Sequence, residues 1–475
     1  MNNITLKALG LLFISIQLSV INQKVLAQAD CKVSIDGSVK KGIVSPSIMG
    51  FNIVYCYESD AGWQNGKGKV PEMIKALGTA QLRYPGGTVV TKYHWEKPTG
   101  QGWSDLWSAD FNPAKNTDPS TFMDIDEYLG VVKAQKIEPL LGINMGSGMK
   151  HNRVREGVEE AVRLMKHCLS KGVKVKYYYL DNEPYQPDAN FTFTPEQYAE
   201  AINLYVPAMK KVDPDIQIIA NTHPNADNYT RVLLAIAGKN IDLMDVHMYW
   251  KFKNATFENW KKEGLMKHRG IRPYNEQRQI FEKVFNEAGF PNIKLVILEW
   301  NIGPAGDGNV APTQGESALM VSEQFTQFIQ GDLFMSTFWP LSWPSNAFRA
   351  LLNQQEQYRP NKTYDMFALY KDILGQQKVS SVGTIKNLIN LAVKSTDGNT
   401  MWVYLINKDQ GQSELNVNIV VEGFNPRSYT AKGFDALSDA KEGLKLSDRK
   451  LIKMDSSNYS IRVPKNSFAK LTFRK

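Results

Sequence analysis

The sequence predicts a (β/α)8 TIM barrel with a C-terminal all-β sandwich domain. Between residues 48 and 375, eight apolar runs of strand length are each followed by a segment with helical spacing. Strands separated by helices form parallel sheets, and eight such units favour a closed barrel. After Gly375 the helical spacing stops, and short alternating runs separated by turn residues follow, which is typical of a sandwich.

The eight strand–helix units can be placed in order along the chain. Thr194-Pro195-Glu196 offers an N-cap followed by a Pro at the first helical position. Pro184 ends the fourth strand, because it has no N–H to give to a sheet. The expected strands are 48–55, 81–84, 139–144, 175–182, 216–221, 242–248, 294–299 and 333–339, and the helices that follow them are 71–77, 122–136, 153–169, 194–212, 229–236, 274–288, 316–329 and 363–374.

An open doubly wound sheet is the alternative to a barrel. Such a sheet usually carries a Gly-rich phosphate loop after its first strand, whereas here that strand leads into Tyr55-Cys56-Tyr57-Glu58. The sandwich strands are expected at 400–405, 415–421, 459–463 and 468–473. The expected division is a signal peptide (1–27), N-terminal strands that join the sandwich (28–47), the barrel (48–375) and the sandwich (376–475).

The first 27 residues predict a cleaved signal peptide. Lys7 precedes an apolar run of residues 8–21, and Val25-Leu26-Ala27 offers small residues for cleavage. The run is shorter than the roughly 20 residues that a membrane-spanning helix needs. A lipid anchor on Cys31 is the other alternative, and Asp30 before it fits poorly. We therefore expect a secreted or periplasmic protein without a membrane span.

The charge composition and the cysteine spacing argue against a nucleic-acid-binding protein and against a cysteine metal site. Removing residues 1–27 takes away Lys7 and Lys24 and no acidic residue, so the net charge falls from +8 to a mildly basic +6. No dense basic stripe suggests nucleic acid. Of the three cysteines, Cys31 and Cys56 are candidates for a pair in an oxidising compartment, and no cysteine spacing is typical of a metal site. We expect no cofactor or metal, and the sequence leaves the oligomeric state open.

Two of the expected strands end in a glutamate. The fourth ends in Asn182-Glu183-Pro184, and the seventh ends in Glu299. The carboxyl ends of barrel strands face the active site, so the two carboxylates are expected to meet there. Glycoside hydrolysis commonly uses two carboxyl groups, one as acid/base and one as nucleophile in retaining enzymes. The pair predicts a retaining glycosidase in which the pKa of the acid/base is raised.

The Asn-Glu-Pro after strand four, with a Glu after strand seven, resembles the retaining glycoside hydrolases of clan A. The resemblance implies that Glu183 is the acid/base and Glu299 the nucleophile, and that Asn182 binds the sugar 2-hydroxyl. Each of two residues also has a purely structural interpretation: Arg83 could form a structural ion pair, and His247 could be a histidine of the core. The further residues expected to bind substrate are Arg83, His247, Tyr249, Trp339 and Trp95.

Different segments resemble different members of the clan. Residues 83–87, His94-Trp95 and 247–249 are similar to α-L-arabinofuranosidases, whereas 338–341 and 349–352 are similar to agarases and related endo-acting enzymes. Many tryptophans fall in loops expected at the catalytic end: Trp95, Trp103, Trp107, Trp260, Trp339 and Trp343. This surface favours endo-cleavage of a plant or algal polysaccharide, and the net charge of +6 adds a mild preference for acidic or sulfated chains. The alternatives are an exo-acting α-L-arabinofuranosidase and a non-catalytic carbohydrate-binding protein.

Overall fold

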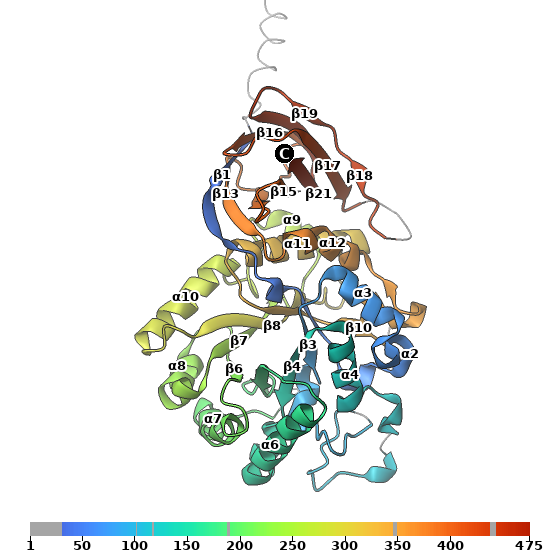
Figure 1. The fold of residues 1–475 in the computed structure, drawn as a ribbon, viewed down its shortest axis with the longest axis vertical. Coiled ribbons are helices and arrows are strands. Elements are labelled where there is room, and N and C mark those ends of the chain that lie inside the picture. Colours follow the sequence, from blue (N-terminus) through green and yellow to red (C-terminus); the bar gives the residue numbers. More distant parts are fainter. Residues whose placement is uncertain (1–30, 101, 116–117, 188–190, 345–348, 438–442) are drawn as a thin grey trace, which may run out of the picture.

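The expected strand–helix units form a closed barrel in the computed structural model, with a β-sandwich beside it (Figure 1). The structure describes residues 31–475 except 101, 116–117, 188–190, 345–348 and 438–442. The expected signal peptide, residues 1–27, lies outside the described residues. Within the part of the chain that the structure describes, no helix combines the length and apolar character needed to cross a bilayer.

The barrel contains eight parallel strands in sequential order, and the first pairs with the last. The predicted fold class, a TIM barrel followed by a sandwich, is confirmed. The carboxyl ends of all eight strands open at one end of the barrel, and the site must lie there. The strands are β2 (Gly50–Asn52), β3 (Gln81–Tyr84), β4 (Glu138–Ile143), β5 (Tyr177–Leu180), β6 (Gln217–Asn221), β7 (Leu243–Trp250), β8 (Lys294–Ile302) and β9 (Ser336–Phe338).

Helices surround the barrel. The N-cap of α7 is Thr194, whose side chain accepts from the backbone of Gln197 while Gln197 caps in return. The short α5 follows β4 directly, at Gly146-Ser147-Gly148. The helices are α2 (Asp60–Trp63), α3 (Lys69–Leu77), α4 (Ile125–Gln135), α5 (Gly146–Lys150), α6 (Val154–Ser170), α7 (Pro195–Lys210), α8 (Asn228–Ala237), α9 (Phe257–Lys262), α10 (Tyr274–Glu287), α11 (Gln314–Gln330) and α12 (Lys362–Tyr370).

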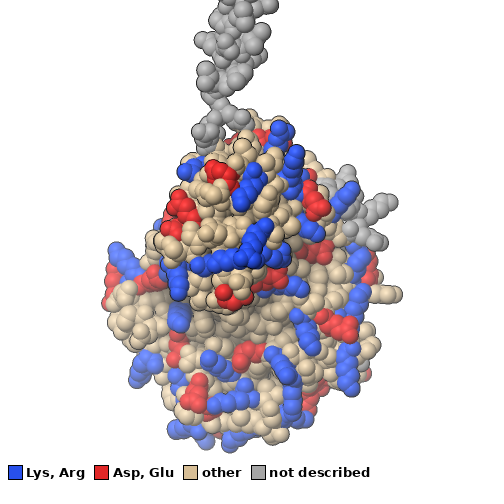
Figure 2. All heavy atoms as spheres, turned by 45° about the horizontal axis from the view of Figure 1, so that its top comes forward, with Lys and Arg blue, Asp and Glu red and all other residues tan. Residues whose placement is uncertain are grey.

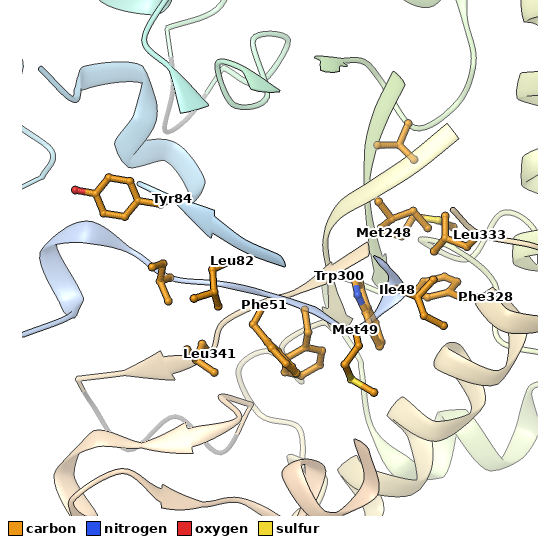
Figure 3. Packing of buried hydrophobic residues seen from close by; sticks show 14 of the residues in the cluster. Ile48, Met49, Phe51, Leu82, Tyr84, Met248, Trp300, Phe328, Leu333 and Leu341 are labelled. Atoms are coloured by element: carbon orange, nitrogen blue, oxygen red, sulfur yellow. The ribbon is translucent and has the colours of Figure 1, made fainter. Parts of the chain in front are cut away.

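Aromatic packing fixes the barrel against α11 and α12. Phe51 of β2, Trp300 of β8 and Phe328 of α11 lie together in the core (Figure 3). The rings of Trp300 and Phe328 are 4.9 Å apart between centroids, and Phe51 meets Phe367 of α12 edge-on at 5.5 Å. Burial of several such rings supplies a large share of the hydrophobic stabilisation of this part of the fold.

The sandwich is built from one continuous sheet of ten strands, in the order β18-β17-β21-β15-β14-β13-β1-β16-β20-β19. The first strand, β1, lies between β13 and β16, so a segment that precedes the barrel completes the domain that follows it. The strands are β1 (Cys31–Ile43), β13 (Gln377–Gly383), β14 (Leu388–Lys394), β15 (Thr400–Asn407), β16 (Glu414–Glu422), β17 (Ser428–Asp435), β18 (Ser447–Asp448), β19 (Leu451–Lys453), β20 (Asn458–Pro464) and β21 (Ser467–Arg474).

The sandwich covers α11, so that nearly every residue of this helix is buried. A fully buried ion pair joins the two domains, with Lys408 Nζ 2.9 Å from Glu323 Oε2. Trp260 of α9 donates its indole N–H to the same carboxylate at 2.7 Å and is itself fully buried. Trp260 therefore belongs to the domain junction, and the expectation that it contributes to an exposed sugar-binding surface is wrong.

A small sheet follows the last barrel strand and shapes the loop above it. It consists of β10 (Ser342–Trp343), β11 (Leu352–Asn353) and β12 (Arg359–Pro360). The Ser342 hydroxyl donates to the buried carboxylate of Glu58, which also accepts from the indole of Trp63. Burial raises the pKa of Glu58 to about 7. This contact holds the loop after β9 against the loop after β2.

The three cysteines are free and buried. Cys31 belongs to the core of the sandwich, whereas Cys56 and Cys168 belong to the core of the barrel. Cys31 and Cys56 therefore do not form the disulfide that their presence in an exported chain suggested. Acidic and basic side chains are both spread over the barrel and the sandwich (Figure 2).

Candidate active site

Glu183 lies just after β5, and Glu299 lies in the carboxyl-terminal half of β8, which continues to Ile302 beyond the expected end of this strand at residue 299. Strand β5 stops at Leu180, and the backbone then turns sharply, with φ of +61° at Asp181 and +43° at Glu183. Non-glycine residues rarely adopt this left-handed region, and such costs cluster at functional sites. The turn brings the Glu183 side chain to the ring of His247, which comes from β7.

His247 stands between the two carboxylates. Its Nδ1 lies 2.8 Å from Glu183 Oε1 and 3.5 Å from Glu299 Oε2. These two distances keep the two oxygens closer together than the roughly 6.5 Å at which the arrangement of inverting glycosidases begins. The geometry therefore fits the shorter carboxyl separation of a retaining enzyme, which leaves no room for a water between the nucleophile and the sugar.

Both oxygens of Glu299 are held. The Tyr249 hydroxyl donates to Oε1 at 2.6 Å, and Arg83 Nη1 donates to Oε2 at 3.3 Å. Tyr249 lies two residues after His247 on β7, so both side chains project from the same face of that strand. The two donors fix the carboxylate plane, and a nucleophile held in one orientation needs no reorganisation before attack.

Arg83 connects the whole site. Its guanidinium is fully buried and lies over the Tyr179 ring, 4.4 Å from the centroid. Besides Glu299 it donates to Asn182 Oδ1 at 2.7 Å and to Asn52 Oδ1 at 2.8 Å. Since the Asn182 oxygen is occupied by Arg83, its amide N–H groups are left to donate to a ligand, as expected for a residue that binds a sugar hydroxyl.

The electrostatics of His247 differ from the expectation for Glu183. Burial disfavours a charged imidazole, but the carboxylates of Glu299, Asp245 and Glu183 outweigh burial and raise the pKa of His247 to about 10. Burial raises the pKa of Glu183, and His247, Arg269 and Arg83 lower it, with the result below its usual range. The expected raised pKa of the acid/base is therefore wrong for the unliganded protein.

A shared proton reconciles this result with acid catalysis. His247 and Glu183 together hold one proton across a 2.8 Å hydrogen bond. Transfer of that proton from Nδ1 to Oε1 produces the neutral acid without any net change in charge. Two groups that interact this strongly titrate as a pair, so the pair keeps its proton far above the ordinary pKa of a carboxyl group.

The structure places the two predicted tryptophans differently. Trp339 follows β9 at the barrel mouth, and its ring packs so closely on Gly87 that a Cβ there would come within 2.5 Å. Trp95 lies apart from the group around Glu183. Its indole N–H donates to the Glu160 carbonyl, and its ring packs on His167 of α6, 4.8 Å away. The structure therefore gives Trp95 a packing role beside α6.

Several residues at the site were missed by the sequence reasoning. Asn52 of β2 links Arg83 to the backbone of Leu298, and Asp245 Oδ2 lies 3.2 Å from His247 Nε2. The sequence could have indicated Asp245, because it precedes His247 by two residues on one strand and its side chain projects from the same face. No sequence feature indicated Asn52 as a site residue, since a lone Asn in a short apolar strand is common.

A cavity of about 380 Å³ lies beside the site, on the loops that follow β3, β4 and β5. Its lining includes Trp103, which is 46% exposed, together with His151 and Phe191. The ammonium groups of Lys92 and Lys150 lie 5.5 and 5.6 Å from the centroid of the Phe191 ring. Among the described residues, no group of three or more His, Cys, Asp or Glu side chains is arranged to hold a metal ion.

In sequence, part of this chain is similar to α-L-arabinofuranosidases. The family model described as "Alpha-L-arabinofuranosidase 1 domain" matches residues 73–265. An intracellular exo-α-(1→5)-L-arabinofuranosidase of Bifidobacterium longum is 25% identical over 194 residues, which cover 38% of this chain and 34% of that protein. α-L-Arabinofuranosidase C of Emericella nidulans is 29% identical over 214 residues, which cover 39% and 41%. The chain thus spans less than half the length of these relatives.

Solved structures of two kinds share the fold. An α-L-arabinofuranosidase of Thermotoga maritima, solved with arabinose, matches with a TM-score of 0.71 at 19% identity over 94% of this chain and all of that one. A bifunctional glucanase-xylanase from a metagenome library matches with a TM-score of 0.65 at 14% identity over 94% and 99%. The resemblance to clan A, with features of arabinofuranosidases and of endo-glycosidases, is confirmed by these matches.

We expect His247→Asn to move the alkaline limb of the pH profile of kcat/KM to lower pH. The wild-type pair keeps its proton until the pH approaches the pKa of His247, about 10. Without the imidazole, only the carboxyl of Glu183 can supply the proton, and it ionises at lower pH. The profile should be measured on a substrate with a poor leaving group, with His167→Asn on α6 as the control. An unchanged alkaline limb in His247→Asn would contradict the shared proton.

Proposed function

We propose that this protein is a retaining glycoside hydrolase that cleaves O-glycosidic bonds in a plant or algal polysaccharide by double displacement. The proposal rests on one observation above all: Glu183 and Glu299 both lie within 3.5 Å of the same nitrogen of His247. Arg83 also keeps its hydrogen bonds to Glu299, Asn182 and Asn52. This intact set of contacts argues against the alternative of a non-catalytic carbohydrate-binding protein.

The geometry supports two chemical steps. In the first, Glu299 attacks the anomeric carbon while Glu183 gives its proton to the departing oxygen, so a glycosyl ester forms as the glycosidic bond breaks. In the second, Glu183 takes a proton from water, and the water oxygen displaces Glu299 from the anomeric carbon. Both displacements invert the carbon, and the product retains the configuration of the substrate. The amide of Asn182 would bind the 2-hydroxyl, where contacts strengthen in the transition state.

Endo-cleavage is the mode that the surroundings of the pair support. Trp339 and Trp343 lie on the loop after β9, with their ring centroids 6.1 Å apart, and Tyr57 packs on Trp343 at 4.6 Å. The cavity with Trp103 and Phe191 lies on loops from a different part of the mouth. Aromatic surfaces at more than one place suit a chain of several sugars, each ring contributing on the order of 1 kcal/mol.

Exo-release of terminal α-L-arabinofuranose is the second candidate. The matching arabinofuranosidase model covers β3 to β7 and Glu183, and the curated relatives carry that activity in their names. We propose that the protein is secreted or periplasmic, because residues 1–27 have the pattern of a cleaved signal peptide. The Bifidobacterium relative, by contrast, is described as intracellular.

Replacement of each glutamate should separate the two roles. Glu299→Ala is expected to abolish turnover of every substrate. Glu183→Ala should cost roughly 10²- to 10⁴-fold on substrates with poor leaving groups and much less on activated aryl glycosides, which need no proton. Azide should partly rescue Glu183→Ala and give a glycosyl azide of retained configuration. Glu196→Ala, an exposed carboxylate on α7, serves as the control. An azide product of inverted configuration from Glu183→Ala would mean that the roles are exchanged.

The earliest digestion products distinguish endo- from exo-action. If the aromatic surfaces bind a chain on both sides of the glutamate pair, a polysaccharide should first yield a ladder of oligosaccharides. Chromatography of samples taken at low conversion, from an arabinan and from algal galactans, measures this directly. Arabinose as the sole early product would rule out the endo-acting form of the proposal and leave the arabinofuranosidase.

A further inference from the structure

Two arginines besides Arg83 flank the catalytic carboxylates. Arg269 lies between α9 and α10, in the loop after β7, and Arg349 lies between β10 and β11, in the loop after β9. Loops that follow barrel strands emerge at the catalytic end. Neither arginine is needed for the two chemical steps, because Arg83, Tyr249 and His247 already hold both carboxylates.

Arg269 is held against the backbone of Tyr249 at a cost, and its charge lowers the pKa of Glu183. Its backbone N–H donates to the Tyr249 carbonyl at 3.0 Å, and its φ is +45°. The guanidinium carbon lies 6.0 Å from the centroid of Phe252, whose side chain is 58% exposed. Nε is buried and has no hydrogen-bond partner among the described residues. Left-handed backbone and an unpartnered buried donor together are typical of a site that waits for a ligand.

Arg349 is held beside Glu299 in a similar way. Its Nε donates to the Ile302 carbonyl at 2.9 Å, which fixes the direction of the guanidinium. The guanidinium carbon lies 5.8 Å from the centroid of Tyr249, the ring whose hydroxyl donates to Glu299. The two terminal nitrogens have no acceptor among the residues that the structure describes. They are therefore available to a ligand bound over Tyr249.

Neither Arg269 nor Arg349 forms an ion pair with a carboxylate among the residues that the structure describes. Asp181 adds a further carboxylate at the mouth, which accepts from Thr91 and from the backbone of Asn182 and Met145. The proton shared by His247 and Glu183 counts once, wherever it sits. The negative groups are Asp245, Glu183, Glu299 and Asp181, and the positive groups are Arg83, Arg269, Arg349 and the shared proton, so the charges balance while the guanidinium groups of Arg269 and Arg349 stay without a direct carboxylate partner among the described residues.

A neutral sugar would offer the guanidinium groups of Arg269 and Arg349 no charged partner. A polymer that covers the mouth removes water from both guanidinium groups, and a buried unpaired charge is costly. An anionic group on the sugar would replace the lost water. The planar guanidinium fork matches the paired oxygens of a carboxylate or a sulfate, so two arginines suit such a group better than they suit hydroxyls.

We propose that Arg269 and Arg349 bind anionic substituents on the sugars that flank the scissile bond, so that the natural substrate is an acidic polysaccharide. Arg269, beside the acid/base, would bind the leaving side, and Arg349, beside the nucleophile, would bind the side that becomes the glycosyl ester. The inference rests on the proposed glycosidase function and adds the chemical class of its substrate. Sulfate ester and carboxylate share the chemistry that these arginines recognise.

Matched polymers test the inference. kcat/KM is measured on a sulfated galactan and its desulfated form, and on a polyuronate and its carboxyl-reduced form. The wild type should prefer one acidic member over its neutral partner by about 10-fold or more, as expected for hydrogen bonds to a charged group. Arg269→Gln and Arg349→Gln should each lower that preference by a similar factor. Arg427→Gln, an exposed arginine of the sandwich, is the charge-matched control and should leave the preference unchanged.

Further measurements keep the outcomes distinct. Thermal unfolding shows whether each variant is folded, and Arg→Lys at either position should restore part of the preference. Binding of the same oligosaccharides to the inert Glu299→Gln variant, measured by calorimetry, reports recognition without turnover. A preference for the sulfated or for the uronate pair identifies the anion. Equal or better cleavage of neutral polymers, in a Glu299-dependent reaction, would overturn the inference and leave the glycosidase standing. Binding of the acidic polymers that depends on the two arginines but leads to no hydrolysis would support the inference and contradict the proposed glycosidase function.

Discussion

The site depends on one buried guanidinium. Arg83 is fully buried and joins Glu299, the proposed nucleophile, to Asn182 and to Asn52 of the first barrel strand, and its guanidinium lies over the Tyr179 ring. These partners come from β2, from the ends of β5 and β8, and from within β5, so the hub forms only when the barrel has closed. Loss of one member of such a buried pair typically costs about 3–5 kcal/mol, because the remaining charge is left uncompensated. Catalytic geometry and barrel closure are therefore linked through the same contacts.

The barrel solves the acid/base problem by sharing a proton. A carboxyl that must stay protonated usually sits in an apolar pocket, but Glu183 lies among Arg83, Arg269 and a cationic His247, all of which stabilise its ionised form. The 2.8 Å bond to His247 keeps the proton one transfer away from Glu183. The guanidinium groups of Arg269 and Arg349, which form no ion pair among the described residues, distinguish this mouth from one built for neutral sugars.

Local signals predicted the architecture and the two glutamates. The sequence pattern around each glutamate spans only a few residues: Pro184 follows Glu183, and an apolar run leads to Glu299. Such local patterns can be recognised without knowledge of the fold. Features that depend on distant packing were not predictable in this way. Trp260 is buried because the sandwich covers α9, Trp95 rests on α6, and the pKa of Glu183 is set by a histidine 64 residues away. Arg269 and Arg349 occupy loops without periodicity, and only tertiary contacts show that they face the carboxylates.

The most direct test of the account is the identity of the residue that becomes covalently bound to the sugar. The enzyme would be incubated with a 2-deoxy-2-fluoro derivative of the sugar that it cleaves, carrying a good leaving group, and then digested for mass spectrometry. Double displacement predicts one glycosyl group per protein, attached to the peptide that contains Glu299, and no label in Glu299→Gln. Label on Glu183 in place of Glu299, or normal substrate turnover with inversion of the anomeric carbon and no trapped ester, would contradict it.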